Sequence, residues 1–329
     1  MHVQRTRVGR RRQAGLTLIE LLVALVLGLL IAAASVAALI VARQGFKSVD
    51  SGAQLRENSR FAASLIQRIT VQAGFENAAY GLITDPKDPG LSGFDDAVVD
   101  TTYAGWTTTA PVLAHGSRSG GCGAVTDTSC QNGSDVLVVR YWGVSTGGTT
   151  TADGTMINCS GRGEPEGADR AFSIFHVVRS AAGEPTLACT YRNTVGAWAT
   201  DPLVGGVEAF QVLYGVDTRK ADGTAAATPA DGDTVADQYL TARQLDTTPG
   251  TVVADNWRRV RTLRIGLVIR GPASDAVDRA ATAAASMPVL GNGFSTGADT
   301  GSALTVAGDG RLRQRLVFTV HLRNAQLAP

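Results

Sequence analysis

One apolar run near the N-terminus constrains this chain more than any other feature. Between Leu16 and Ala42 the only ionisable side chain is that of Glu20. About 27 residues at about 1.5 Å each make a helix of roughly 40 Å, which exceeds the roughly 30 Å of a lipid hydrocarbon core. We therefore expect a helix that crosses a membrane once.

The charges that flank this run predict its orientation. Five arginines lie within the first twelve residues, whereas the flank after the run carries only Arg43 and Lys47. By the positive-inside rule the N-terminus is expected in the cytoplasm and everything after about residue 45 outside. A secretory signal cut near Ala32–Ser35 is the alternative, but the apolar run continues to Ala42 without the polar break typical of a mature N-terminus.

All four cysteines, Cys122, Cys130, Cys159 and Cys189, follow the apolar run and so fall on the side predicted to be outside. Disulfides form in such oxidising compartments. Four cysteines allow three pairings. We favour Cys122 with Cys130 and Cys159 with Cys189, because these pairs close the shortest loops; four buried thiols are the alternative.

Glu20 needs a physical explanation, because an ionised carboxylate in a lipid core costs on the order of 2.5 kcal/mol or more. One explanation is that its position near one helix end lets it reach the lipid headgroups. The other is that a positive group neutralises it.

The order of motifs at the N-terminus resembles the class III signal of type IV pilins and pseudopilins. A basic leader is followed by Gly15, by the segment Leu16-Thr17-Leu18-Ile19-Glu20 and by the unbroken apolar run. In that family a prepilin peptidase cuts after the glycine and methylates the new N-terminus. The resemblance implies a cut between Gly15 and Leu16, and an assembly role for Glu20 together with Thr17. Leu16 departs from the usual phenylalanine, a change that we expect to be tolerated.

The implied cut would supply the missing partner of Glu20. It creates an ammonium group at Leu16, about one helical turn away, so the carboxylate gains a partner in its own chain or in a neighbouring chain. In the filament model of the family, Glu20 of one subunit meets the N-terminus of the next and sets the axial register.

We expect the helix to continue beyond the membrane, because apolar residues keep an approximate 3.6-residue spacing. Residues 1–15 would form the leader, 16–42 the transmembrane half and 43–75 an amphipathic half that ends near Gly74. Gly28 and Gly45 could bend this helix or could permit close helix packing. The apolar positions of the second half are Phe46, Val49, Ala53, Ala62, Leu65, Ile66, Ile69 and Ala73.

Residues 76–329 are expected to form a β-rich body, with loops and short strands over 76–134 and inserted loops over 217–256 and 271–310. The last two strands alternate most cleanly, and each is expected to bury one face. Strands grouped after one long helix predict an α+β fold, in which the helix packs on an antiparallel sheet with long loops. The expected strands are 136–142, 171–178, 186–192, 207–214, 263–270 and 316–323.

Several body segments also resemble the PilW-type minor pilins. They include residues 55–62, 205–216, 237–243, 258–270 and 311–324. Taken with the N-terminal motif, the resemblance covers most of the chain and implies a pilin-like fold.

We find no pattern typical of an enzyme or a cofactor site. The histidines are scattered, and the nucleotide-binding and nucleophile-elbow motifs are absent from the sequence. Asp231, Asp233 and Asp237 have part of the spacing of a calcium loop, but a turn held by aspartate side chains is the favoured interpretation. With a net charge of +1, no nucleic-acid partner is expected.

The sequence therefore predicts a non-enzymatic minor pilin of a Gram-negative bacterium. It would cross the inner membrane once with its body in the periplasm, and later reach the pilus at the cell surface. Its expected partners are the prepilin peptidase, other minor pilins and the major pilin, within a priming or tip complex. The alternatives are a minor pseudopilin of a type II secretion system, and a membrane-tethered binding or enzymatic domain.

Overall fold

The computed structural model of the chain describes residues 15, 17–76, 89–99, 131–147, 149–167, 170–193, 196–248, 252–272, 285–295, 299, 301–306 and 308–324. The chain forms two compact units, Met1–Asp50 and Ser51–Pro329.

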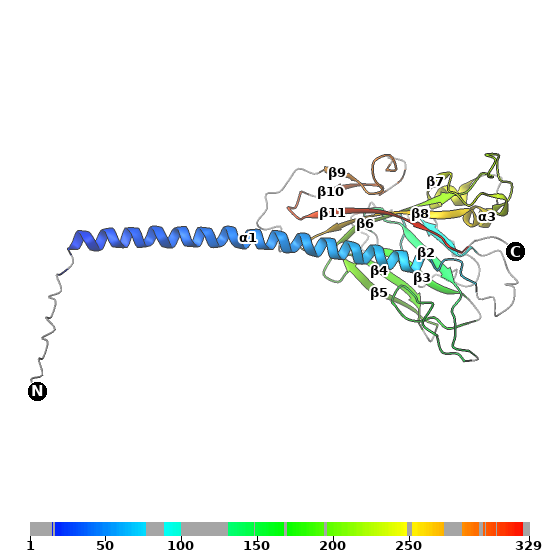
Figure 1. The fold of residues 1–329 in the computed structure, drawn as a ribbon, viewed down its shortest axis with the longest axis horizontal. Coiled ribbons are helices and arrows are strands. Elements are labelled where there is room, and N and C mark those ends of the chain that lie inside the picture. The colour runs from blue at the N-terminus through cyan, green and yellow to red at the C-terminus, as the bar shows by residue number, and fades with distance from the viewer. Residues whose placement is uncertain are drawn as a thin grey trace, which may run out of the picture. The chain divides into compact units, whose positions relative to one another are not determined.

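One helix, α1 (Leu18–Thr70), runs for 53 residues, and it continues through Gly28 and Gly45 without interruption (Figure 1). The long helix predicted from the sequence is confirmed, and neither glycine unwinds it. A turn follows, with Gly74 at a φ of 69°, a conformation that glycine adopts without steric cost. The Asn324 side chain donates to the carbonyls of Val71 and Ala73 and so satisfies backbone groups at the helix end.

The strands form two main antiparallel sheets, where a single sheet was expected. The five-stranded sheet keeps the sequence order β1-β2-β3-β4-β5. Its strands are β1 (Leu91–Phe94), β2 (Val136–Tyr141), β3 (Ala171–Arg179), β4 (Pro185–Arg192) and β5 (Trp198–Gly205).

The four-stranded sheet has the order β11-β8-β6-β7, and β9 and β10 pair as a separate antiparallel two-stranded sheet. All strand pairs of the four-stranded sheet are antiparallel. The strands are β6 (Val207–Val216), β7 (Gln238–Leu240), β8 (Val260–Arg270), β9 (Ala285–Pro288), β10 (Ala303–Val306) and β11 (Arg313–His321).

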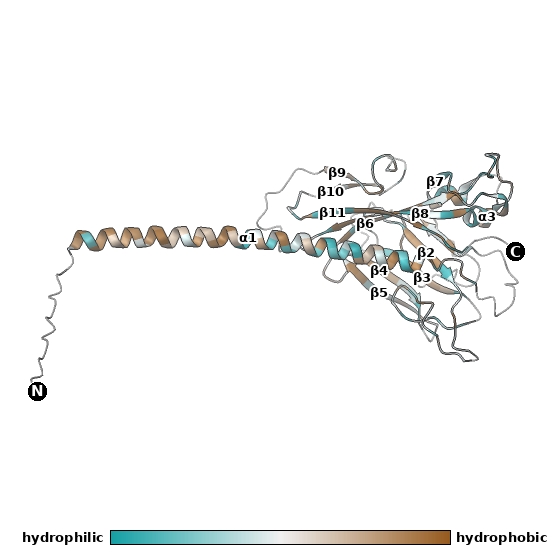
Figure 2. Ribbon diagram, viewed as in Figure 1, coloured by the Kyte–Doolittle hydropathy of each residue, from teal (hydrophilic) through white to brown (hydrophobic). Residues whose placement is uncertain are grey.

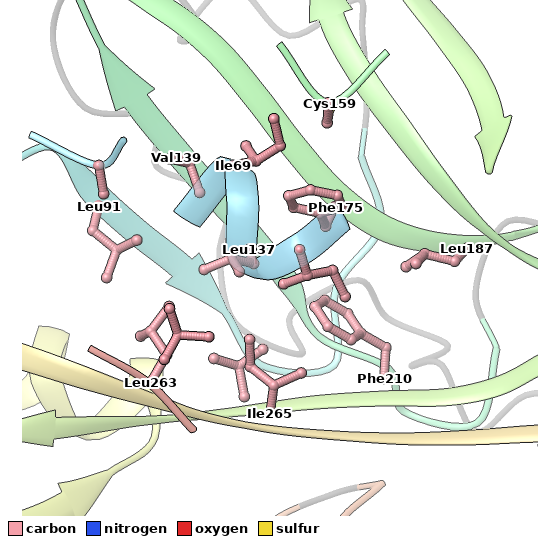
Figure 3. Packing of buried hydrophobic residues seen from close by; sticks show 14 of the residues in the cluster. Ile69, Leu91, Leu137, Val139, Cys159, Phe175, Leu187, Phe210, Leu263 and Ile265 are labelled. Atoms are coloured by element: carbon pink, nitrogen blue, oxygen red, sulfur yellow. The ribbon is translucent and has the colours of Figure 1, made fainter. Parts of the chain in front are cut away.

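The main core lies where α1 meets both sheets. Ile69 is fully buried and shares one cluster with Phe175 of β3 and with Phe210 and Ile265 of the second sheet (Figure 3). The part of α1 that contributes is a stripe with three- and four-residue spacing, as helical geometry requires. Its buried residues are Ser51, Leu55, Ser59, Ala62, Ile66, Ile69 and Thr70, and Ala73 in the turn after the helix is buried as well.

The predicted helix stripe was wrong in its first part. Phe46 and Val49 are 77% and 70% exposed, and Ala53 is exposed as well. Ala53 and Ala62 are nine residues apart, which is about two and a half turns, so they lie on opposite faces of the helix. The predicted stripe had therefore assigned residues from two different faces of the helix to a single apolar face.

The prediction of one buried face for β8 was also wrong. Leu263, Ile265 and Leu267 enter the main core as expected, but Val268 on the other face is equally buried, in a cluster with Val289 and Leu304. The β9–β10 segment therefore covers the second face. A side chain at Gly266 would lie 2.5 Å from the Val289 carbonyl oxygen, so this approach requires a glycine.

The segments predicted as plain loops contain short elements. The segment 217–256 contains η3 (Pro229–Asp231), β7, α2 (Ala242–Thr247) and the start of α3 (Val253–Arg258). The segment 271–310 contains β9 and β10. Contacts distant in sequence hold them: Asp95 accepts from the backbone N–H groups of Ala242 and Arg243 at the start of α2. A local signal was present only in part: Thr241 and Gln244 form a capping box at the start of α2, whereas the bonds to Asp95 depend on the tertiary structure.

Candidate functional site

The start of α1 brings two of the predicted site residues together. Thr17 directly precedes the helix, and its backbone N–H and its hydroxyl both donate to Glu20 Oε2, at 2.9 and 3.0 Å. In return the backbone N–H of Glu20 donates to Thr17 Oγ1 at 3.3 Å. This reciprocal arrangement is a capping box, which satisfies two backbone donors that the first helical turn leaves without partners.

The capping box gives Glu20 a role that the sequence analysis missed. The signal was present, because Thr followed three residues later by Glu immediately before an apolar run is the sequence signature of such a cap. Thr17 is thereby the direct partner of the Glu20 carboxylate. The expected pairing with an ammonium at Leu16 lies outside the described residues, as do residues 1–14 of the leader.

From Leu21 to Ala42, α1 carries no charged residue, and apolar residues lie on all of its faces (Figure 2). Leu25 and Ile31, for example, are 61% and 68% exposed. A helix that is apolar all round needs a lipid or protein environment on every side. Among the described residues, α1 is the helix that is long and apolar enough to cross a membrane.

The predicted pair Cys159–Cys189 forms a disulfide, with the two Cα atoms 5.7 Å apart. Both residues are buried, and they belong to the main core. Cys122 and Cys130 lie outside the described residues, so their pairing stays a prediction.

The three aspartates of the possible calcium loop are used separately. Asp231 accepts from the backbone N–H and hydroxyl of Thr228, Asp237 accepts from those of Thr218, and Asp233 accepts from the Val235 N–H. The bonds of Asp231 and Asp233 hold local turns, whereas those of Asp237 join two segments that are 19 residues apart. In the part of the chain that the structure describes, no cluster of three or more potential metal-ligating acids, histidines or cysteines occurs.

Buried acids elsewhere tie the two sheets together. Asp135, just before β2, accepts from the backbone N–H of Val212 in β6 at 2.8 Å, and its own N–H donates to the Phe210 carbonyl. Burial raises the pKa of Asp135 well above its usual value, with the nearby Asp95 and Asp299 as further causes. The sequence analysis did not single out these residues, since their roles depend on contacts across about 75 residues.

His176, predicted to be structural, lies in β3 with its Nε2 2.8 Å from Thr190 Oγ1. Burial lowers the pKa of its imidazole to about 4. The ring therefore stays neutral over the physiological range, which suits a buried hydrogen-bonding residue.

Comparisons with known proteins add two family matches. The chain matches the prokaryotic N-terminal methylation motif over residues 10–36 and the type IV pilus-assembly protein W family over residues 174–324. Among solved structures it is similar to a type IV-like pilin from Thermus thermophilus, at 16% identity and a TM-score of 0.39, covering 82% of this chain and 96% of that one. No curated protein sequence matches the chain.

Proposed function

We propose that this chain, which belongs to the PilW-type minor pilins, is cut by a prepilin peptidase and incorporated at low copy into a priming or tip complex that begins the pilus fibre. Its N-terminal methylation motif and its pilus-assembly domain support this role. Pilins are structural proteins, and we propose no catalytic activity for the chain.

The observation that carries the proposal is the capping box at the start of an apolar helix. Before the cut, Thr17 supplies the hydrogen bonds of the Glu20 carboxylate. After a cut between Gly15 and Leu16, a new ammonium group stands about one turn from Glu20. A buried carboxylate without a positive partner is strongly unfavourable, so the ammonium of an adjacent subunit can select the axial register during assembly.

We propose an orientation with the N-terminus in the cytoplasm of a Gram-negative cell and the body in the periplasm. The arginines before α1 support this orientation through the positive-inside rule. The Cys159–Cys189 disulfide supports an oxidising compartment for the body.

N-terminal analysis of the exported chain tests the processing step. We expect a mature chain that starts at a methylated Leu16, detected by mass spectrometry of its first peptide. A Gly15→Val variant, which places a bulky side chain before the cut, should retain the leader. A mature chain that keeps residues 1–15, or that starts after the alanines near residue 34, would contradict the proposal.

A deletion strain separates the pilus from a type II secretion pseudopilus. The match to a pilus-assembly family favours the pilus. We expect the deletion to remove surface fibres, seen by electron microscopy, and to leave the secretion of extracellular enzymes unchanged. Loss of secretion with intact fibres would favour the pseudopilus.

A further inference from the structure

The edges of the two main sheets differ in how they are protected against unwanted pairing. Natural proteins blunt sheet edges with short strands, prolines and bulges. Strands β1 and β7 have only four and three residues. Strand β5 contains Pro202, which has no N–H to offer, and its ladder with β4 carries a register shift at Leu187/Ala188. Each of these edges is therefore a poor template for another strand.

Strand β11 lacks these protections. Its nine residues pair with β8 in an uninterrupted register, from Arg313 opposite Arg270 to His321 opposite Thr262. It contains neither proline nor glycine, and its centre, residues 316–320, carries no charge. A long, regular and uncharged edge of this kind favours the addition of another strand.

The hydrogen bonds at the two ends of β11 show which backbone groups face outward. The Leu322 N–H donates to the Arg261 carbonyl, and the Gly271 N–H donates to the Leu312 carbonyl. In an antiparallel ladder this pattern repeats every second residue, so the even-numbered residues of β11 bond to β8. The odd-numbered residues Arg315, Val317 and Thr319 direct their N–H and C=O groups away from it.

The charge at the start of β11 does not guard this edge. Arg313 is almost completely buried, and its guanidinium is neutralised by Glu208 and Asp309 at 2.6 and 2.7 Å. These ion pairs hold the strand in place instead of repelling a partner.

The exposed charged side chains along β11 and just after it are those of Arg315 and Arg323, and both are positive. Arg315 donates from one guanidinium nitrogen to the Pro288 carbonyl, and the sequence from residue 310 to 324 contains no acidic residue. A strand that pairs with this edge gains most when it carries aspartate or glutamate at the facing positions.

We propose that the open edge of β11 is a docking site for an acidic edge strand of another pilin subunit, which extends the β11-β8-β6-β7 sheet across the subunit boundary. The identification of the partner as a pilin rests on the proposed function. Backbone groups of Val317 and Thr319 form the centre of the added ladder, and Arg315 pairs with a carboxylate of the incoming strand.

Two variants at one position test the ladder. Val317→Pro removes an outward N–H but no bond to β8, a change that edge strands tolerate, and Val317→Thr keeps both the N–H and the branched side chain. The full-length chain is co-expressed with the other pilin subunits of the same bacterium, and each copurified subunit is quantified by mass spectrometry. We expect Val317→Pro to recover about tenfold less of one partner pilin, and Val317→Thr to recover the wild-type amount. Equal recovery by the two variants would overturn the proposal.

Hydrogen exchange on the unmodified chain gives a readout that does not depend on variants. The amides of Val317 and Thr319 should exchange quickly in the chain alone and slowly in the complex, while those of Leu316 and Phe318 exchange slowly in both. Slow exchange of Val317 in the chain alone would mean that the chain covers its own edge, and would overturn the proposal. Recovery of a second copy of this chain in place of another pilin would overturn it as well.

The deletion strain distinguishes this proposal from the proposed function. Intact fibres in the deletion strain would refute the pilus role whatever β11 does. Suppose that the deletion removes the fibres, and that expression of the Val317→Pro variant in the deletion strain restores them and copurifies the wild-type amount of the partner pilin. That result would refute the docking edge and leave the proposed function intact.

Discussion

At the scale of single residues, the hydrogen bonds between Thr17 and Glu20 connect local helix chemistry with the assembly role that we propose for Glu20. A carboxylate that caps its own helix already has hydrogen-bond partners before any second subunit arrives. Two demands therefore fall on Glu20, the cap and the proposed pairing with an ammonium. They can be separated, because the cap needs only an acceptor oxygen, whereas the pairing needs a charge.

We predict that Glu20→Gln abolishes fibre assembly while leaving the helix start intact. Glutamine can accept from Thr17 as glutamate does in a capping box, but it cannot neutralise an ammonium. Glu20→Val should remove both roles. Fibres are counted by electron microscopy, with the amount of membrane-inserted chain as the control. Normal fibre numbers with Glu20→Gln would show that capping alone is the function of this residue.

His176 gives a prediction about pH. Its pKa of about 4 in the folded chain lies below the usual 6.5, so between these values the unfolded chain binds a proton that the folded chain does not. Lowering the pH through this window therefore favours unfolding. From pH 7 to pH 5 we expect His176→Gln to lose about 2 kcal/mol less stability than the wild type. Denaturant unfolding at both pH values measures this, and identical losses in the two proteins would contradict it. Comparing the two proteins cancels the effects of buried acids such as Asp135.

At the scale of the elements, α1 serves two environments with two different surfaces. Between Leu21 and Ala42 it is apolar on every face, whereas from Ser51 onward one stripe is buried in the body and the opposite face carries polar residues such as Glu57 and Arg60. The change matches what each part contacts, because lipid tolerates apolar side chains all round and a folded body covers only one face.

The buried stripe is tested by truncating Ile66, which is 0% exposed. Ile66→Ala should lower the free energy of unfolding by about 2–5 kcal/mol, through lost burial and the cavity that remains. Phe61→Ala on the outer face, where Phe61 is 51% exposed, should cost less than about 1 kcal/mol. Thermal unfolding of the full chain in detergent measures both, and similar losses would show that this face is not the packed one.

At the scale of the whole molecule, the Cys159–Cys189 disulfide acts by restricting the unfolded chain. The two cysteines are 30 residues apart. Closing a loop of that length is worth about 3–4 kcal/mol in the chain-entropy model. We expect the Cys159→Ala, Cys189→Ala double variant to lose about this much stability and to be degraded faster by added protease. A variant with unchanged resistance to protease and denaturant would show that packing alone holds these segments.

Strands β2, β3, β4, β6, β8 and β11 fall where residue patterns predicted them. Strand β5 was missed, because Pro202 and Asp201 are unusual in strands, and it forms as an edge along β4. Within the candidate site, Thr17, Glu20 and the Cys159–Cys189 pair were predicted, whereas the capping box was not. The edge position of β11, which lies outside that site, was not predicted either.

The sequence by itself determined the apolar helix and most strand positions, because these depend on spacings of two to four residues along the chain. Only the tertiary structure decided which face of α1 is buried, that β8 is covered on both sides, and that β11 is an edge strand among the strands that the structure describes. These features depend on contacts between residues far apart in the sequence, which local periodicity cannot specify.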